Sequence, residues 1–131
     1  MFHELNKFCD ALDCDAADTI YSDIIDTGYA NVGDVEQIIL EVWSEIDGDG
    51  AGTLDITLQS SNNEAFTHSG ASIVKDEFSL PQKAAANLAK GQIFEGALPK
   101  GLYRYLRLKL VTTTGFTSGK CLITAALRNQ G

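Results

Sequence analysis

Strict two-residue alternation between apolar and polar side chains constrains this chain more than any other feature of its sequence. In Thr53–Gln59, the run TLDITLQ places an aliphatic side chain at every second position and a polar one between. Val35–Ile46 behaves in the same way, with Leu40 and Val42 on one face and Trp43 on the other. Side chains of a β strand point alternately to the two faces of its sheet, so both segments are predicted to be half-buried strands.

Further strands follow from the same pattern, separated by turn-forming residues. They are Tyr21–Asp26, Ile73–Leu80, Gln92–Leu98, Leu102–Val111 and Lys120–Arg128. Many short strands divided by frequent turns favour an all-β antiparallel sandwich or barrel over alternating β-α-β units. The glycine-dense segment Asp47–Gly52 is predicted to be a hairpin turn between two antiparallel strands.

Two segments depart from the strand pattern. The run QKAAANLAK in Gln82–Lys90 has a helix-forming composition, which predicts a short helix or connector. Near the start of the chain, Phe2, Leu5, Phe8 and Leu12 recur at near-helical spacing. A single helix of this length is marginal in water, so we expect residues 1–18 to form an arm that packs on its own sandwich or on a neighbouring subunit. Residues 19–131 are then predicted to be the β-sandwich domain.

The charge of the chain excludes some classes of partner. With 18 acidic and 10 basic residues, the formal net charge is −8, so neither nucleic acid nor an anionic membrane is an expected partner. The charge is unevenly distributed, at −12 in residues 1–49 and +4 in residues 50–131. We therefore expect the acid-rich first strands and the basic late strand to form two separate, complementary surfaces.

The cysteines fit folding in a reducing cytoplasm, which we expect because the N-terminus lacks the pattern of a secretory signal. Cys9, Cys14 and Cys121 are an odd number and cannot form a closed disulfide framework. The alternation of KCLITAAL places Cys121 on the buried side of its strand, where a free cysteine behaves as a small apolar residue.

The sequence offers little that could perform catalysis, so no enzyme, cofactor or metal is predicted. The run DGDGAG at Asp47–Gly52 resembles part of a calcium loop, but Leu58 stands where an EF-hand needs an acidic ligand. The two histidines, His3 and His68, are too few for a three-histidine metal site. His68 has no evident orienting acid in the sequence, which makes a nucleophilic triad a poor interpretation.

One strand suggests a binding surface for a protein partner. In LYRYLRLKL, the outward row is predicted to carry Tyr103, Tyr105, Arg107 and Lys109. Tyrosine and arginine are favoured in protein interfaces because they combine a large contact area with hydrogen bonds, although such a row is also compatible with an ordinary solvated face. Arg104 falls on the inward row, so it must be ion-paired or lie beyond the buried part of the sheet.

Three stretches resemble a known family when they are taken in order: SDIIDTG at 22–28, GTLDITLQSSNNEAF at 52–66 and LPKGLYRYLRLKL at 98–110. Their order and spacing resemble the Bbp16-like family of small capsid cement proteins of tailed bacteriophages, whose pattern runs through "IDLG", "TV.LQTSDD.AF" and "LP…RYLRL" segments. The resemblance extends from about residue 8 to residue 128. Thr27 departs from the pattern, since the family has an apolar residue there.

This resemblance implies a jelly-roll β-sandwich that assembles as a homo-oligomer and binds the outer surface of an assembled capsid, with the major capsid protein as partner. It implies residence in the virion after synthesis in the host cytoplasm. The candidate partner-binding residues are Tyr103, Tyr105, Arg107, Lys109, Phe2, Leu5 and Phe8. Two alternatives stay open: a tail or fibre module of a phage, and a carbohydrate-binding sandwich that uses Trp43 or the Tyr103/Tyr105 row as a stacking platform.

Overall fold

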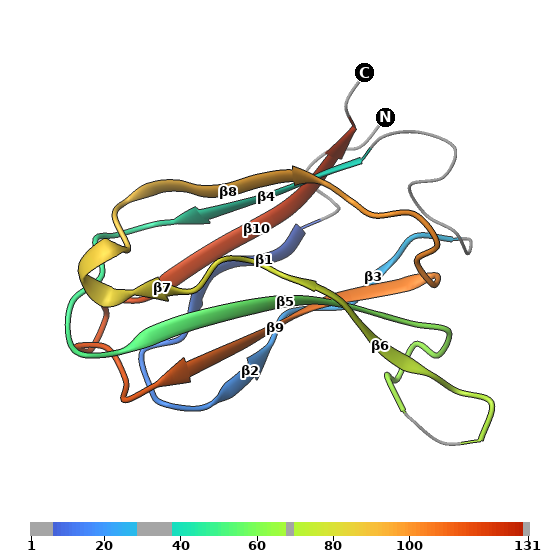
Figure 1. Ribbon diagram of the computed structural model, residues 1–131, viewed down its shortest axis with the longest axis horizontal. Helices are drawn as coiled ribbons and strands as arrows, with labels where there is room; N and C mark the ends of the chain where they lie inside the picture. Colours follow the sequence, from blue (N-terminus) through green and yellow to red (C-terminus); the bar gives the residue numbers. More distant parts are fainter. Residues whose placement is uncertain (1–6, 29–37, 68–69, 130–131) are drawn as a thin grey trace.

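The computed structural model describes residues 7–28, 38–67 and 70–129, which form ten strands and one 3-10 turn (Figure 1). The strands are β1 (Lys7–Asp13), β2 (Thr19–Tyr21), β3 (Ile25–Asp26), β4 (Ile38–Ser44), β5 (Thr53–Ser61), β6 (Val74–Ser79), β7 (Lys83–Ala84), β8 (Gly91–Ala97), β9 (Tyr105–Thr113) and β10 (Leu122–Asn129). The turn, η2, spans Ala85–Asn87. No helix in these ranges is long and apolar enough to cross a membrane.

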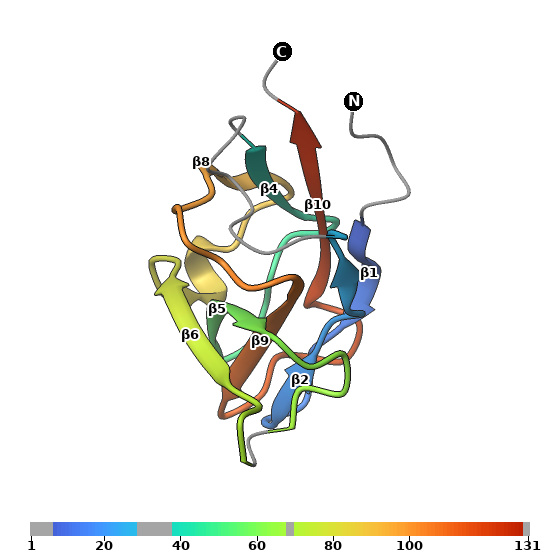
Figure 2. The same ribbon diagram turned by 90° about the vertical axis from the view of Figure 1, so that its right-hand side faces the viewer.

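The strands form two antiparallel sheets that pack face to face (Figure 2). The four-stranded sheet has the order β1-β10-β4-β8, and the six-stranded sheet has the order β2-β9-β5-β6, with β3 also paired to β9 and β7 to β5. The chain passes from one sheet to the other after β1, β3, β4, β7, β8 and β9. This interleaving is the jelly-roll arrangement, so the predicted fold class is confirmed.

The core lies between the sheets and is built from the inward rows that the alternation predicts. Its best-buried members include Leu54, Ile56 and Leu58 of β5, Leu106, Leu108 and Leu110 of β9, Leu40 and Val42 of β4, and Ile123 and Ala125 of β10. Cys121 is fully buried beside this last row, which confirms its predicted place in the core. The residues between these positions face outward, so the outer faces of the sheets carry the side chains available for contact.

The prediction of a hairpin turn at Asp47–Gly52 is wrong. β4 belongs to the four-stranded sheet and β5 to the six-stranded sheet, so this segment crosses the end of the sandwich. The Oδ1 atom of Asp47 accepts a hydrogen bond of 2.8 Å from the Lys90 amide, which fixes the start of the crossing. A Cβ atom on Gly52 would lie 2.5 Å from the carbonyl oxygen of Gly115, so glycine is required there for close approach of two backbones.

The helix-forming composition of Gln82–Lys90 produces only β7 and the single 3-10 turn η2. β7 pairs with β5, and the Ala85 amide donates a hydrogen bond of 2.9 Å to the Gly52 carbonyl. These tertiary contacts hold the segment extended along the sheet and outweigh its weak intrinsic preference for helix.

The helical spacing expected near the N-terminus is wrong for Lys7–Asp13, which is strand β1 and pairs with β10. The register of β1 shifts at two places, and Ala11 adopts a positive φ of 50°. Phe8 is fully buried in the core, so it is not a surface residue of the sandwich. Phe2 and Leu5 lie outside the described residues.

Candidate partner-binding face

The outer row of β9 carries the predicted contact residues on the six-stranded sheet. Tyr105, Arg107 and Lys109 are partly exposed and alternate with the buried leucines of the same strand. Tyr103 is also partly exposed, but it precedes β9. The predicted outward direction of this row is therefore confirmed for its three members within the strand.

Arg107 is enclosed by two aromatic rings from elsewhere in the chain. Its guanidinium carbon lies 3.9 Å from the centroid of the Tyr21 ring on β2 and 4.3 Å from that of Phe66. Cations are attracted to the faces of aromatic rings, and the attraction grows where water is excluded. Tyr21 is 45% exposed, whereas Phe66 is only 7% exposed, so the arginine lies between an open ring and a buried one.

A hydrogen-bond relay across the sheet holds the same arginine in one direction. Nε of Arg107 donates to Oε1 of Gln59 at 2.8 Å, and Nε2 of Gln59 donates to Oδ1 of Asp76 on β6 at 2.7 Å. Partial burial lowers the pKa of the Arg107 guanidinium from its ordinary value, which is high enough that the group keeps its charge. The side chain is thus charged, oriented and partly dehydrated.

The loop after β5 brings Phe66 over the sheet. Phe66 adopts a positive φ of 52°, an uncommon conformation for an aromatic residue, and its amide donates a hydrogen bond of 2.9 Å to the Asn63 carbonyl. The Asn62 side chain links the residues after β5 to those before β6. Its Nδ2 donates a hydrogen bond of 2.9 Å to the Ala71 carbonyl, and its Oδ1 accepts one of 2.8 Å from the Ile73 amide. The SNNEAF segment therefore positions the Phe66 ring against the Arg107 guanidinium.

A second charged cluster lies beside the first, at the beginning of β9. Nε and Nη2 of Arg104 donate to the two carboxylate oxygens of Asp26 at 2.7 and 2.9 Å, and the guanidinium lies 5.1 Å from the Tyr105 ring centroid. The hydrogen bond from Arg104 holds the pKa of Asp26 below its ordinary value. Arg104 is exposed, paired and outside the strand, as its place on the inward row required.

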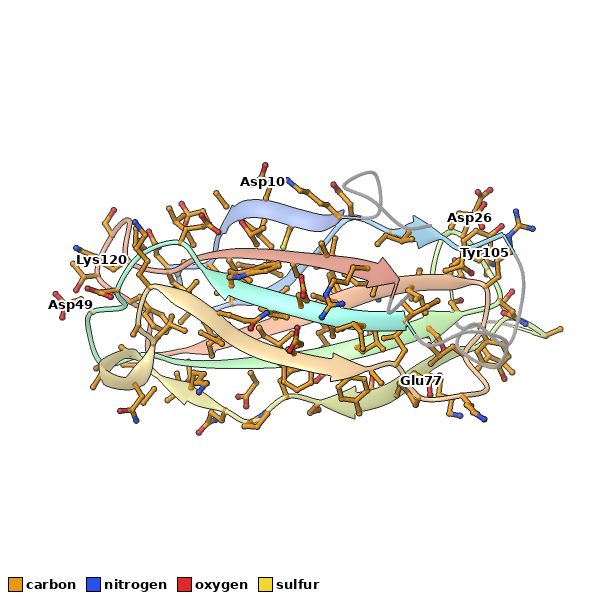
Figure 3. All side chains as sticks on the ribbon, turned by 90° about the horizontal axis from the view of Figure 1, so that it is seen from above. Asp10, Asp26, Asp49, Glu77, Tyr105 and Lys120 are labelled. Atoms are coloured by element: carbon orange, nitrogen blue, oxygen red, sulfur yellow. The ribbon has the colours of Figure 1, made fainter. Side chains whose placement is uncertain are left out.

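These clusters form one surface, which we call the arginine face. It consists of Tyr21, Asp26, Gln59, Phe66, Arg104, Tyr105 and Arg107. The strand register brings its parts together, because Asp26 and Ser61 pair with Tyr105 from either side and Gln59 pairs with Arg107. Figure 3 shows Asp26 and Tyr105 at one end of the sandwich, with Asp49 and Lys120 at the opposite end.

Charge that is segregated along the sequence is not segregated in space, so the expectation of two separate charged surfaces is wrong. Strands from the acidic first part of the chain pair with strands from the basic last part: β2 and β3 with β9, and β1 and β4 with β10. Asp26 pairs with Arg104 in one sheet and Glu41 with Arg128 in the other. Attraction between opposite charges on neighbouring strands stabilises this arrangement locally.

A hollow of about 370 Å³ lies on the outer face of the four-stranded sheet. It is lined by Lys7, Glu41, Trp43, Thr124, Ala126, Leu127 and Arg128. Trp43 is partly exposed, as expected for the outward row of β4. Arg128 is ion-paired with Glu41 and lies 2.6 Å from a carboxylate oxygen of Glu95, whose pKa it holds below its ordinary value.

The described part of the chain does not gather candidate metal ligands into one site. Within residues 7–28, 38–67 and 70–129, no group of three or more His, Cys, Asp or Glu side chains is placed to hold a metal ion. In the DGDG segment, carboxylate oxygens of Asp47 and Asp49 accept backbone hydrogen bonds, from Lys90 and Gly50 respectively. His3 and His68 lie outside the described residues.

A jelly-roll sandwich with an ordered outer face of arginine and aromatic residues has an architecture shared by viral capsid and lectin domains. The comparison with protein families is more specific, because the model of the Bbp16 family matches residues 10–125. The chain belongs to the Bbp16 family of phage structural proteins, as the resemblance in its sequence implied. No curated protein matches it.

Sequence reasoning identified only part of the arginine face. It selected Tyr105 and Arg107 from a single strand and missed Tyr21 and Phe66, which enclose the arginine. A signal was available, because Phe66 ends one of the three segments that carry the family resemblance. These segments contain no catalytic motif, and Phe66 shows that a residue in such a segment can position another side chain, here Arg107.

Proposed function

We propose that this chain is a capsid cement protein that binds the outer surface of an assembled phage capsid and stabilises it. The partner is the major capsid protein, and the chain acts as a homo-oligomer in the virion after synthesis in the host cytoplasm. The observation that carries the proposal is the meeting of the three family segments at the arginine face, on a fold with no evident catalytic use for them.

The arginine face has the physical properties of an interface hot spot. Arg107 and its neighbours are oriented before any partner arrives, so little side-chain entropy remains to be lost on binding. Arginine and tyrosine dominate the energy of many protein interfaces. A protein that binds only the assembled shell stabilises that shell by mass action, and many repeated copies make modest contacts collectively strong.

Cosedimentation with expanded capsids of the phage that encodes the chain tests this proposal. We expect the purified protein to sediment with capsids and to raise the temperature at which they dissociate. The Arg107→Glu variant should bind at least tenfold more weakly, because it places a carboxylate between two ring faces. Binding is measured well below the unfolding temperature of each variant, with circular dichroism as the check on folding.

Lys120→Glu is the matched control for this experiment. It makes the same change of charge, but on an exposed loop at the opposite end of the sandwich (Figure 3). It should leave capsid binding within about twofold of the natural protein, since its contribution is confined to long-range attraction. Failure of the natural protein to bind any capsid form would refute the cement function, and equal losses in the two variants would exclude the arginine face as the contact.

The hollow at Trp43 favours carbohydrate binding as a second candidate function. Each cationic group of the hollow has an acidic partner. Arg128 is ion-paired with Glu41 and Glu95, and Nζ of Lys7 lies 3.5 Å from Oδ2 of Asp10. A site with balanced, engaged charges suits a neutral polyhydroxyl ligand better than an anion or a cation. The partly exposed indole offers an apolar face for a sugar ring, and the volume lies in the range of small-molecule sites.

A glycan array separates this function from capsid binding. Labelled protein should retain neutral glycans, Trp43→Ala should lose them, and Arg107→Glu on the other sheet should keep them. Blank arrays with the natural protein would eliminate the carbohydrate candidate. Loss of capsid binding in Trp43→Ala would instead assign the hollow to the capsid contact.

A further inference from the structure

Two of the three cysteine thiols are in direct contact inside the sandwich. Sγ of Cys14 lies 2.8 Å from Sγ of Cys121, and both residues are fully buried. Cys14 directly follows β1 and Cys121 directly precedes β10. The pair therefore lies at one end of the β1–β10 pairing in the four-stranded sheet. Cys9, the third thiol, is also buried, but its Sγ faces the carbonyl oxygen of Ile123.

The backbone holds the two cysteines opposite one another. The β1–β10 register ends with Asp13 opposite Leu122, and the Cys14 amide continues it by donating a hydrogen bond of 2.9 Å to the Cys121 carbonyl. The carboxylate of Asp15 accepts hydrogen bonds from the Gly119 and Cys121 amides at 2.5 and 3.1 Å, which fixes the neighbouring loop. Residues directly opposite on antiparallel strands bring their Cβ atoms to about 4.5–5.5 Å, close to the spacing that a disulfide needs.

We infer that Cys14 and Cys121 form an intramolecular disulfide when the protein meets a peroxide oxidant, whereas Cys9 remains a thiol. One thiol attacks hydrogen peroxide, forms a sulfenic acid and releases water. The second thiol then attacks that sulfur, the S–S bond forms, and a second water leaves. Overall, two thiols and one hydrogen peroxide give one disulfide and two waters, with the two electrons passing to the peroxide oxygens.

The environment of the thiols makes this reaction slow and selective. The hydrogen bond with Cys121 and burial raise the pKa of the Cys14 thiol, and burial raises that of Cys9 to about 11. The reactive thiolate is therefore rare at all times, and stray modification is suppressed. Cys14 differs from Cys9 because the Cys121 sulfur is in contact with it. That neighbouring thiol reacts with the sulfenic acid as soon as it forms.

The biological setting of this inference rests on the proposed function, whereas the chemistry does not. A capsid protein folds in a reducing cytoplasm and later meets an oxidising medium outside the lysed host, where disulfides persist. The disulfide would join two residues 107 positions apart in the sequence and link the end of β1 to the start of β10. Closing so long a loop in the unfolded chain should raise the unfolding temperature by on the order of 10 °C.

The test uses the full-length protein treated with hydrogen peroxide and then blocked with a thiol-alkylating reagent. Intact mass should show the loss of two hydrogens and one alkylated thiol. Proteolysis without reductant should release a peptide that links Cys14 to Cys121. The unfolding temperature should rise after oxidation and return to its starting value after reduction.

Cys9→Ser is the matched control, because it removes the buried thiol of the neighbouring strand β1 and leaves the Cys14–Cys121 pair. Its oxidation should yield the same linked peptide, whereas Cys14→Ala and Cys121→Ala should yield none and gain no thermal stability. A link that includes Cys9, dimers joined between chains, or three alkylated thiols after oxidation would each overturn the inference. The peptide map of the natural protein decides the matter even where a variant fails to fold. None of these results depends on capsid binding, so the two proposals fail separately.

Discussion

Replacing Arg107 by alanine measures how firmly the arginine face is ordered. The substitution removes contacts to the rings of Tyr21 and Phe66 at 3.9 and 4.3 Å and one hydrogen bond to Gln59. Each cation–π contact contributes about 0.5–1 kcal/mol, and the hydrogen bond contributes about 1 kcal/mol net. The free energy of unfolding should fall by about 2 kcal/mol, which for a domain of this size lowers the unfolding temperature by about 6–10 °C.

Chemical denaturation monitored by circular dichroism, with a double-mutant cycle, provides the assay. Lys109→Ala is the matched control, since it removes a cation from the same face of the same strand, and it should change stability by less than about 0.5 kcal/mol. Combining Arg107→Ala with Tyr21→Ala should give a coupling energy of about 0.5–1.5 kcal/mol. A coupling energy near zero, or equal costs at Arg107 and Lys109, would refute the stacked arrangement.

Three further substitutions, one of them with a control, test other parts of the fold. Phe8→Ala should lower the free energy of unfolding by about 3–5 kcal/mol in urea titrations, because it empties a fully buried site, whereas Ile24→Ala, at a 41% exposed side chain, should have little effect. Gly28→Ala should cost about 1 kcal/mol by the same measurement, since Gly28 has a φ of +90° and a Cβ there would meet no atom within 4 Å. The pKa of Asp26 is lowered in the folded state, so its stabilising contribution is present above about pH 4 and is lost as the pH falls further. Arg104→Gln should therefore make the urea midpoint less dependent on pH in that acidic range, and an unchanged slope would contradict the pairing.

Alternation predicted the inner rows of the sandwich because burial on one face leaves a direct trace in the sequence. Leu54, Ile56 and Leu58 recur at every second position, as do the leucines of β9, and all of them are buried. The opposite row then had to face outward, which located Arg107 and Lys109 correctly. This inference needs no knowledge of which strands are neighbours.

Neighbouring strands could not be predicted, because pairing depends on contacts between distant parts of the chain. Turn residues at Asp47–Gly52 indicate that the chain reverses, but they do not indicate whether β5 returns to the sheet of β4. In the folded protein, β5 pairs with β9 on one side and with β6 and β7 on the other, which leaves no edge of β5 for β4. A hairpin and a crossing between sheets have nearly the same local composition.

The irregular register of β1 explains why its sequence has near-helical spacing. The register of β1 shifts between Lys7 and Cys9 and again between Cys9 and Leu12, and Ala11 has a positive φ. An extra residue in a bulge interrupts the two-residue period, so inward side chains are no longer at even spacing. Phe8 and Cys9 are adjacent and both buried, which breaks the alternation, whereas the spacing of four between Phe8 and Leu12 occurs on one face of a helix as well as on one face of a strand.

Apart from Tyr21, the arginine face is formed by residues from the three segments that carry the family resemblance. Asp26 contacts Arg104 and Phe66 contacts Arg107, and both contacts form because β9 lies between β3 and β5. A solvated strand face needs no such convergence, since isolated polar side chains satisfy their hydrogen bonds with water. The proposed cement function assigns this ordered Arg107 side chain to contact with a partner. Arg107→Lys separates the two roles: lysine keeps the charge but loses the planar stacking, so capsid binding should fall while the fold remains intact.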